Sequence, residues 1–179
     1  MNCCPLVCFT SKRGVTLLEL LAVISILMIL SILGVVAYKP LIARAENAKC
    51  LSNMRSLHTA LSGHVQDKGQ WPQEPPELWE QGNAEGLEDW WVTALEPYGV
   101  TVATWRCPTI FRALQKNDPD ARPKTHYMPS KFDALALSPY RWNTQPWLVE
   151  IGDMHGKGGN ICFPDGSIRQ MNEFLPATP

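Results

Sequence analysis

Hydrophobic residues run almost without interruption along one segment near the start of the chain. Residues 15–38 read VTLLELLAVISILMILSILGVVAY, and Glu19 is the one charged residue among them. A helix rises about 1.5 Å per residue, so this segment is long enough to cross a hydrocarbon core about 30 Å thick. The pattern predicts a transmembrane helix over residues 15–38.

The hydrophobic positions become periodic after this segment. Apolar residues recur mostly at steps of three and four, with polar residues on the other faces, which is typical of an amphipathic helix. We expect residues 39–69 to continue the same helix, with a kink at Pro40 and an end at Gly69. The stripe expected to face the core comprises Leu41, Ala45, Ala48, Cys50, Met54, Leu57, Leu61 and Val65.

The remaining residues, 70–179, predict a small globular domain. Proline, glycine and polar residues dominate two stretches, which predict loops over 70–86 and 117–125. Between these loops, residues 87–96 predict a short helix, and residues 101–106 alternate weakly and predict a strand.

The end of the chain predicts a β-meander. The expected strands are 147–151, 160–163 and 167–171. Asp165–Gly166 is a strong hairpin signal and predicts a type I′ turn, which would pair Phe163 with Ile168 across the two strands. The chain as a whole predicts an α+β fold, in which a long N-terminal helix packs on a small antiparallel β-sheet.

Charge is distributed unevenly along the chain. The net charge is -1, but Lys12 and Arg13 lie just before the apolar run and no acid precedes them; without residues 1–14 there are 14 bases and 17 acids, or -3. Basic residues favour the cytoplasmic side, so we expect the N-terminus inside and the domain outside, although Lys39 and Arg44 oppose this bias. A negatively charged domain does not suggest a nucleic-acid partner.

Glu19 requires an explanation, because a carboxylate inside a bilayer is costly. The sequence SKRGVTLLELL places Glu19 fifth after Gly14, and it resembles the processing site of type IV prepilins and type II secretion pseudopilins. The resemblance implies that a prepilin peptidase removes residues 1–14 as a leader and methylates the new amine of Val15. It also implies that Glu19 offsets the Val15 amine of a neighbouring subunit in a filament. Family members usually have Phe at the position of Val15.

Two further motifs carry the same resemblance. Residues 105–108 read WRCP, a tetrapeptide similar to one in many secretion pseudopilins, and His155 precedes Asp165–Gly166 by nine intervening residues, which matches a C-terminal signature of prepilin-type proteins. The resemblance implies a pilin-like fold and a single-pass inner-membrane protein with a periplasmic domain. The implied partners are the peptidase, other pilin or pseudopilin subunits, the assembly platform and the lipid bilayer.

Cysteines and acidic residues suggest few other sites. If the leader is removed, three cysteines remain and allow one disulfide; we favour Cys50–Cys107, while the pairings with Cys162 stay open. We expect no zinc site, because no close Cys/His pair is present, and no cofactor. His155 is expected to be a turn residue. A calcium site formed by Glu150, Asp153 and Asp165 is a minor alternative.

The sequence therefore favours a structural protein, with no catalytic residues, over an enzyme. The main prediction is a subunit, minor or processing-associated, of a type II secretion pseudopilus or a type IV pilus-like filament. An adhesive or DNA-uptake pilin is the second hypothesis, and a membrane-anchored enzyme that uses His155 is the third. The competing interpretation of the N-terminal segment is an ordinary secretory signal cleaved after Val35–Val36–Ala37, which would make Tyr38 the mature N-terminus. We find no nucleophile motif of the hydrolase or metalloprotease type.

Overall fold

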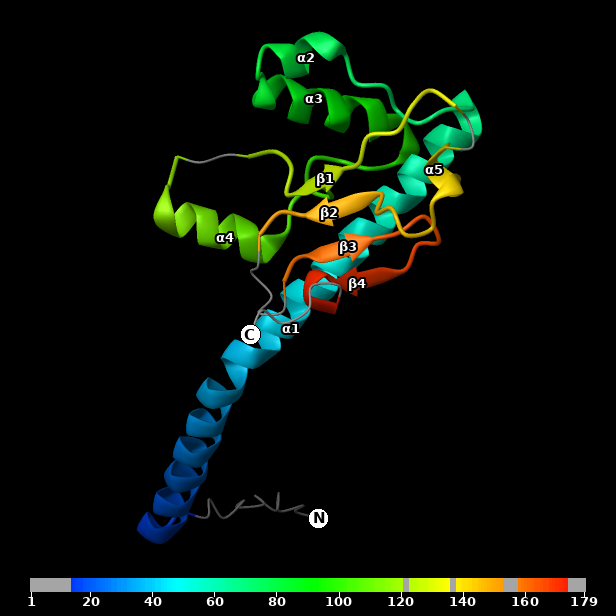
Figure 1. Cartoon of the computed structure of the whole chain (residues 1–179). Helices are drawn as coiled ribbons and strands as arrows, with labels where there is room; N and C mark the ends of the chain where they lie inside the picture. The colour runs from blue at the N-terminus through cyan, green and yellow to red at the C-terminus, as the bar shows by residue number, and fades with distance from the viewer. Residues whose placement is uncertain (1–13, 121–122, 136–137, 153–157, 174–179) are drawn as a thin grey trace, which may run out of the picture. The chain divides into compact units, whose positions relative to one another are not determined.

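A computed structural model describes residues 14–120, 123–135, 138–152 and 158–173 (Figure 1). The chain divides into two compact units, Met1–Leu41 and Ile42–Pro179. The fold is α+β, with an apolar N-terminal helix and a small antiparallel sheet of four strands. The leader residues 1–13 and His155 lie outside the described residues.

Helix α1, Leu17–Lys68, belongs to both units and contains Pro40 without ending there. It ends where the sequence predicts, because Gly69 adopts a φ of +71° and its N–H donates to the Val65 carbonyl at 2.9 Å. A left-handed glycine of this kind is a common helix stop. The predicted transmembrane and amphipathic segments are thus parts of one helix.

In the first unit, most side chains of α1 are apolar, and Glu19 and Lys39 are the charged exceptions. Its segment Leu17–Gly34 has a mean hydropathy of 2.6 and is long and apolar enough to cross a membrane. The hydroxyls of Ser25 and Ser31 donate to carbonyls one turn earlier, at 2.8 and 2.7 Å. These polar groups are therefore hydrogen-bonded within the helix itself, as an apolar solvent requires.

The second unit adds short helices and a sheet to the rest of α1 (Figure 1). Its helices are α2 (Pro76–Glu80), α3 (Ala84–Leu95), α4 (Pro108–Asn117) and α5 (Ser138–Arg141), with 3-10 turns at Glu96–Tyr98 and Met171–Glu173. Its strands are β1 (Tyr127–Pro129), β2 (Leu148–Glu150), β3 (Asn160–Cys162) and β4 (Ile168–Gln170), paired antiparallel in the order of the sequence.

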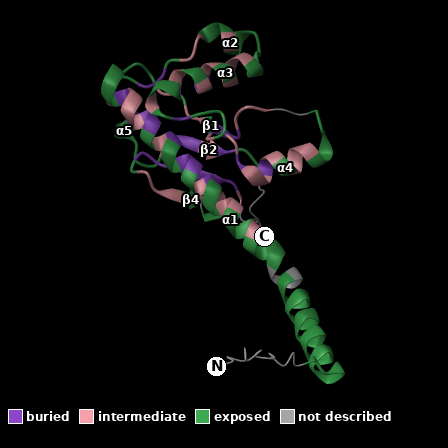
Figure 2. Ribbon diagram, turned by 180° about the vertical axis from the view of Figure 1, so that it is seen from behind, coloured by how far each residue is buried: buried purple, intermediate pink, exposed green. Residues whose placement is uncertain are grey.

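The core lies between one face of the sheet and α1 (Figure 2). From Cys50 onward, the predicted stripe on α1 is buried as expected: Cys50, Met54, Leu57, Leu61 and Val65. Four of the seven tryptophans are also buried, Trp71, Trp91, Trp105 and Trp147, and they contact each other or neighbouring aromatic rings edge-on or tilted. Burial of large aromatic rings is a major source of stability in a domain of this size.

The predicted stripe begins too early. Leu41, Ala45 and Ala48 are exposed, whereas the polar residues Glu46 and Asn47 are half-buried. Glu46 pairs with Arg112 and accepts a hydrogen bond from Thr109 at 3.0 Å, so the start of α4 meets this turn of α1 through polar contacts. A periodicity argument cannot detect a helix face that is covered by ion pairs.

The predicted strand at residues 101–106 is wrong. The N–H groups of Thr104 and Trp105 donate to the carbonyls of Thr101 and Val102, which closes two successive turns. The buried indole of Trp105 anchors this curled segment to the core. Three helices, α2, α4 and α5, and the strand β1 were not predicted.

The terminal hairpin is present, but its turn is not of type I′. Gly166 donates its N–H to the Phe163 carbonyl at 2.9 Å, and Gly166 has a φ of +77°. Asp165 has no positive φ, which a type I′ turn would require. Pro164 instead fixes the geometry of a type I turn, and the left-handed glycine follows it.

The correct loop has three residues rather than two, and this shifts the register by one. Cys162, not Phe163, pairs with Ile168. With this register Cys162 and Ile168 lie on the same face of the sheet, and both pack in the core.

Candidate functional site

The residues around the predicted cleavage point precede α1. Gly14, Val15 and Thr16 are exposed and non-helical. A Cβ atom added to Gly14 would meet no atom within 4 Å, and Gly14 has no positive φ. Neither the backbone conformation nor the packing of the folded chain therefore requires glycine at position 14.

Glu19 lies in the first turn of α1, three residues after the helix cap. Thr16 caps the helix: its Oγ1 accepts the Glu19 N–H at 3.2 Å, and its carbonyl accepts the Leu20 N–H at 3.1 Å. Thr16 and Glu19 thus have the spacing of a capping box, and a carboxylate in the first turn complements the helix dipole. This cap was not predicted, although Thr16-x-x-Glu19 is a readable signal in the sequence.

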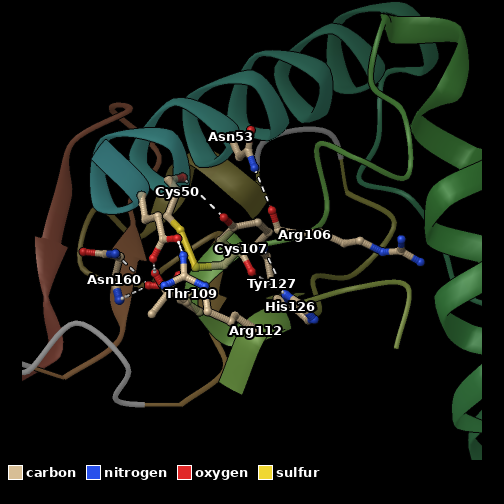
Figure 3. The surroundings of a disulfide bond; sticks show 11 residues. Cys50, Asn53, Arg106, Cys107, Thr109, Arg112, His126, Tyr127 and Asn160 are labelled. Atoms are coloured by element: carbon tan, nitrogen blue, oxygen red, sulfur yellow. Dashed lines mark hydrogen bonds and ion pairs between the residues drawn. A yellow bond between two sulfur atoms is a disulfide. The ribbon is translucent and has the colours of Figure 1, made fainter. Parts of the chain in front are cut away.

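A disulfide joins Cys50 of α1 to Cys107, the residue that precedes α4 (Figure 3). It is the pairing that the sequence favoured among three. Both residues are fully buried, and their Cα atoms lie 5.1 Å apart. The bond encloses a loop with a sequence separation of 57, which contains α2 and α3.

Hydrogen bonds hold the backbone on both sides of the disulfide (Figure 3). Asn53 Nδ2 donates to the Arg106 carbonyl at 2.9 Å, and the Cys107 N–H donates to His126 Nδ1 at 2.9 Å. The Tyr127 hydroxyl donates to the Cys50 carbonyl at 3.4 Å. Burial lowers the pKa of His126 and raises the pKa of Tyr127, so both side chains are held neutral. None of these partners could be assigned from sequence spacing.

A buried carboxylate lies beside the disulfide. Glu150 accepts two hydrogen bonds from Asn160, from the backbone N–H at 3.0 Å and from Nδ2 at 2.6 Å. A carboxylate oxygen of Glu150 and the sulfurs of Cys50 and Cys107 lie within 4.8 Å of one another. With the two sulfurs bonded to each other, neither is the thiolate that a metal ion would require.

The C-terminal signature is only partly described. Gly166 lies against α1, where an added Cβ would come within 3.4 Å of the His58 ring, and His58 Nε2 contacts the Pro164 carbonyl at 3.0 Å. Asp165 is exposed; its carboxylate accepts the Ser167 N–H at 2.8 Å, and hydrogen bonds from Ser167 lower the pKa of Asp165. His155 and Asp153 lie outside the described residues.

The third cysteine of the second unit has a thiol of low reactivity. Among the described cysteines, Cys162 keeps its thiol, which is buried against α1. Burial, followed by the nearby Asp165 charge, raises the pKa of Cys162 to about 12. A thiol with such a pKa is a poor nucleophile at neutral pH.

Together these features place a free, capped N-terminal segment on an apolar helix and a disulfide-bonded domain on its continuation. Four features of this arrangement were not predicted from the sequence: the Thr16 cap, the Asn53 and His126 contacts and the Glu46 ion pair. No known protein family, no curated protein and no solved structure matches this chain.

Proposed function

We propose that this protein is a prepilin-like structural subunit, a minor pseudopilin of a type II secretion pseudopilus or a related type IV pilus-like filament. A prepilin peptidase would cleave between Gly14 and Val15 and methylate the Val15 amine. The mature chain would be anchored in the inner membrane with its domain in the periplasm, and would assemble through its apolar helix with other subunits.

The observation that carries the proposal is the position of Glu19. It is the one charged side chain in an apolar segment whose every face is exposed. Such a helix must be covered by lipid or by other apolar helices, and both surroundings penalise an unpaired carboxylate. The Val15 amine that cleavage creates on an adjoining subunit would supply the missing positive charge.

The Thr16 cap offers a competing explanation for Glu19, because a glutamate at this helix position is favoured even without a filament. The two explanations differ in what they require. A cap needs a hydrogen-bond acceptor, which glutamine also supplies, whereas pairing with an amine needs the negative charge. Glu19→Gln therefore separates them.

The disulfide supports a domain outside the cytoplasm. Stable disulfides persist in oxidising compartments such as the periplasm and are rare in the cytosol. Cys50 lies on the same helix as the apolar segment, twelve residues beyond Tyr38. An oxidised Cys50–Cys107 bond thus agrees with the orientation that Lys12 and Arg13 favour.

The test is the mass of the mature chain, measured on protein extracted from membranes. We expect loss of residues 1–14 and the gain of one methyl group on Val15. Gly14→Leu should prevent both changes. Gly34→Leu is the matched control, because Gly14 and Gly34 both have open space around an added Cβ, and it should be processed normally.

Two results would overturn the proposal. A mature N-terminus at Tyr38 would identify residues 1–37 as an ordinary secretory signal. Normal processing of Gly14→Leu would show that the glycine is not read by a peptidase.

A further inference from the structure

The second unit contains a cavity of about 470 Å³ between helices α2 and α3 and the strands β1 and β2. One wall is the outer face of the sheet, where Met128 lies opposite Val149 and Ile151 follows. The opposite wall is formed by Leu87 and Trp91 of α3 and by Trp79 of α2. Met128 and Ile151 are exposed although they are large and apolar. Cavities of this size and lining are typical of sites for small molecules.

A fixed carboxylate lies in this cavity. The side chain of Glu74 is only 6% exposed. Its Oε1 accepts the Trp91 indole N–H at 2.6 Å, and its Oε2 accepts the Trp79 indole N–H. Two indoles therefore hold both oxygens, and a buried carboxylate held in this way requires a cation nearby.

The cation is supplied by Lys131. Its Nζ lies 3.4 Å from Glu74 Oε2 and 3.4 Å from the centre of the Trp79 ring. The position combines an ion pair with a cation–π contact, which is the usual recognition mode for ammonium groups. The Lys131 side chain is 56% exposed, in contrast to that of Glu74. Lys131 can therefore move into solvent at little cost, whereas Glu74 and the indoles stay in place.

The charge of the lining indicates which ligand fits. Two lining residues are acidic, Glu74 and Glu88, and Lys131 alone is basic, so the formal charge of the lining is -1. An anion would be repelled by this balance. A neutral apolar molecule would fill the cavity but would gain nothing from Glu74. A cation with an apolar body fits the cavity best, because its charge pairs with Glu74 and its apolar body contacts the apolar face of the sheet.

We propose that this cavity binds a small amphiphilic organic cation. Its ammonium group takes the place of Lys131 between Trp79 and Glu74, and its apolar body lies on Met128, Val149 and Ile151. Lys131 then acts as a built-in competitor that occupies the cation position when no ligand is bound. This inference does not depend on the filament role of the chain, since it concerns residues of the second unit only.

The experiment uses the full chain in lipid nanodiscs and three water-soluble probes: benzyltrimethylammonium, benzyl alcohol and benzoate. Binding is measured by isothermal titration calorimetry. We expect saturable binding of the cation, weaker binding of the alcohol and none of the anion. Lys131→Met keeps the aliphatic stem and removes the competing charge, so it should tighten cation binding by about tenfold, because the competent state is then always populated.

Two variants control the result. Lys124→Met removes the same charge from a lysine that pairs with Asp89 at 2.5 Å and does not line this cavity, and it should leave the affinity unchanged. Glu74→Gln should abolish the preference for the cation over the alcohol. If Glu74→Gln does not fold, as judged by its melting curve, the two lysine variants still decide the question.

Several outcomes would overturn the proposal. Failure of the Lys131→Met variant to bind the cation saturably would exclude the site. Equal affinity for the cation and the alcohol would make the cavity merely apolar, and preference for benzoate would make Lys131 the ligand-binding group. If Lys124→Met and Lys131→Met increased the affinity for the cation equally, the increase would come from the net charge of the protein and not from the cation position in the cavity.

Discussion

The two parts of helix α1 differ both in apolar content and in surroundings. From Leu17 to Gly34 the helix is apolar on every face and exposed on every face. From Cys50 to Val65 the apolar residues form one buried stripe and polar residues occupy the other faces. Both parts are α-helical, so the difference lies in the number of apolar side chains and in their distribution around the axis.

One continuous helix is thus stabilised by two different surroundings. The first part needs an apolar exterior, and its serine hydroxyls are bonded internally. The second part is stabilised by the sheet, the tryptophans and the disulfide of its own domain. Changes confined to one part should therefore affect either membrane and filament behaviour or domain stability, but not both.

The largest effect should come from the disulfide, which restrains the second part alone. Replacing both Cys50 and Cys107 by alanine should lower the free energy of unfolding of the domain by about 4 kcal/mol, given the length of the loop that the bond closes. All seven tryptophans follow residue 70, so tryptophan fluorescence of full-length protein during denaturation reports on the domain.

Cys162→Ala is the matched control for the disulfide. It removes a buried sulfur without breaking a cross-link and should cost much less than the double substitution. Membrane insertion should be unaffected in all these variants. A double variant as stable as wild type would show that the domain does not depend on the bond.

The next effect compares one substitution in the two parts of the helix. Leu57→Ala should destabilise the domain by about 3 kcal/mol, because Leu57 is fully buried and its truncation leaves a cavity. Leu27→Ala, in the exposed apolar segment, should leave domain unfolding unchanged. Both are measured by denaturant titration of detergent-solubilised protein. Equal losses would mean that the two parts do not behave independently.

Much of this contrast could be predicted from the sequence, because it depends on local patterns. The apolar run, the buried positions Cys50, Met54 and Leu57, the stop at Gly69 and the terminal hairpin are all readable from spacing and turn residues. The helix start was also readable at Thr16 and was overlooked.

The rest depends on contacts between distant residues. Residues 101–106 have a strand-like pattern, but the burial of Trp105 curls them into turns. Helix α4 begins with Pro108 directly after a disulfide cysteine, and its contacts to Glu46 could not be read from local composition. The Glu74 carboxylate comes from a proline-rich loop and acquires its role only when α2 and α3 bring two indoles to it.

A smaller effect should appear at the terminal hairpin. Gly166→Val should destabilise the domain by about 1 to 2 kcal/mol, because a β-branched residue is strained at a φ of +77°. Gly166→Asn is the control, since asparagine tolerates this conformation better. Melting curves of the two variants should differ, with the valine variant melting lower; coincident curves would contradict the turn geometry.

The smallest effect concerns pH. Burial lowers the pKa of His126 below its ordinary value of 6.5. The unfolded chain therefore takes up a proton before the folded chain does, so domain stability should be constant above pH 6.5 and should fall as the pH drops below it. The loss is at most about 1.4 kcal/mol per pH unit for one proton.

His126→Asn keeps an acceptor for the Cys107 N–H and should flatten this dependence. Burial also lowers the pKa of His64, so wild type and variant are compared at each pH rather than judged by the wild-type slope. Identical pH profiles would rule out a contribution from His126.

The most direct test of the account is the assembly of Glu19 variants. Glu19→Gln keeps the capping spacing with Thr16 but removes the charge, and Thr16→Ala removes the cap but keeps the charge. Glu19→Leu removes both functions of the side chain and should favour membrane insertion slightly.

Each variant is expressed beside wild type, and the fraction of cleaved protein recovered in sheared or crosslinked filaments is measured. We predict normal cleavage after Gly14 in all three, near-normal assembly of Thr16→Ala, and loss of assembly of Glu19→Gln and Glu19→Leu. Normal assembly of both Glu19 variants would contradict the proposed pairing of Glu19 with the Val15 amine of a neighbouring subunit.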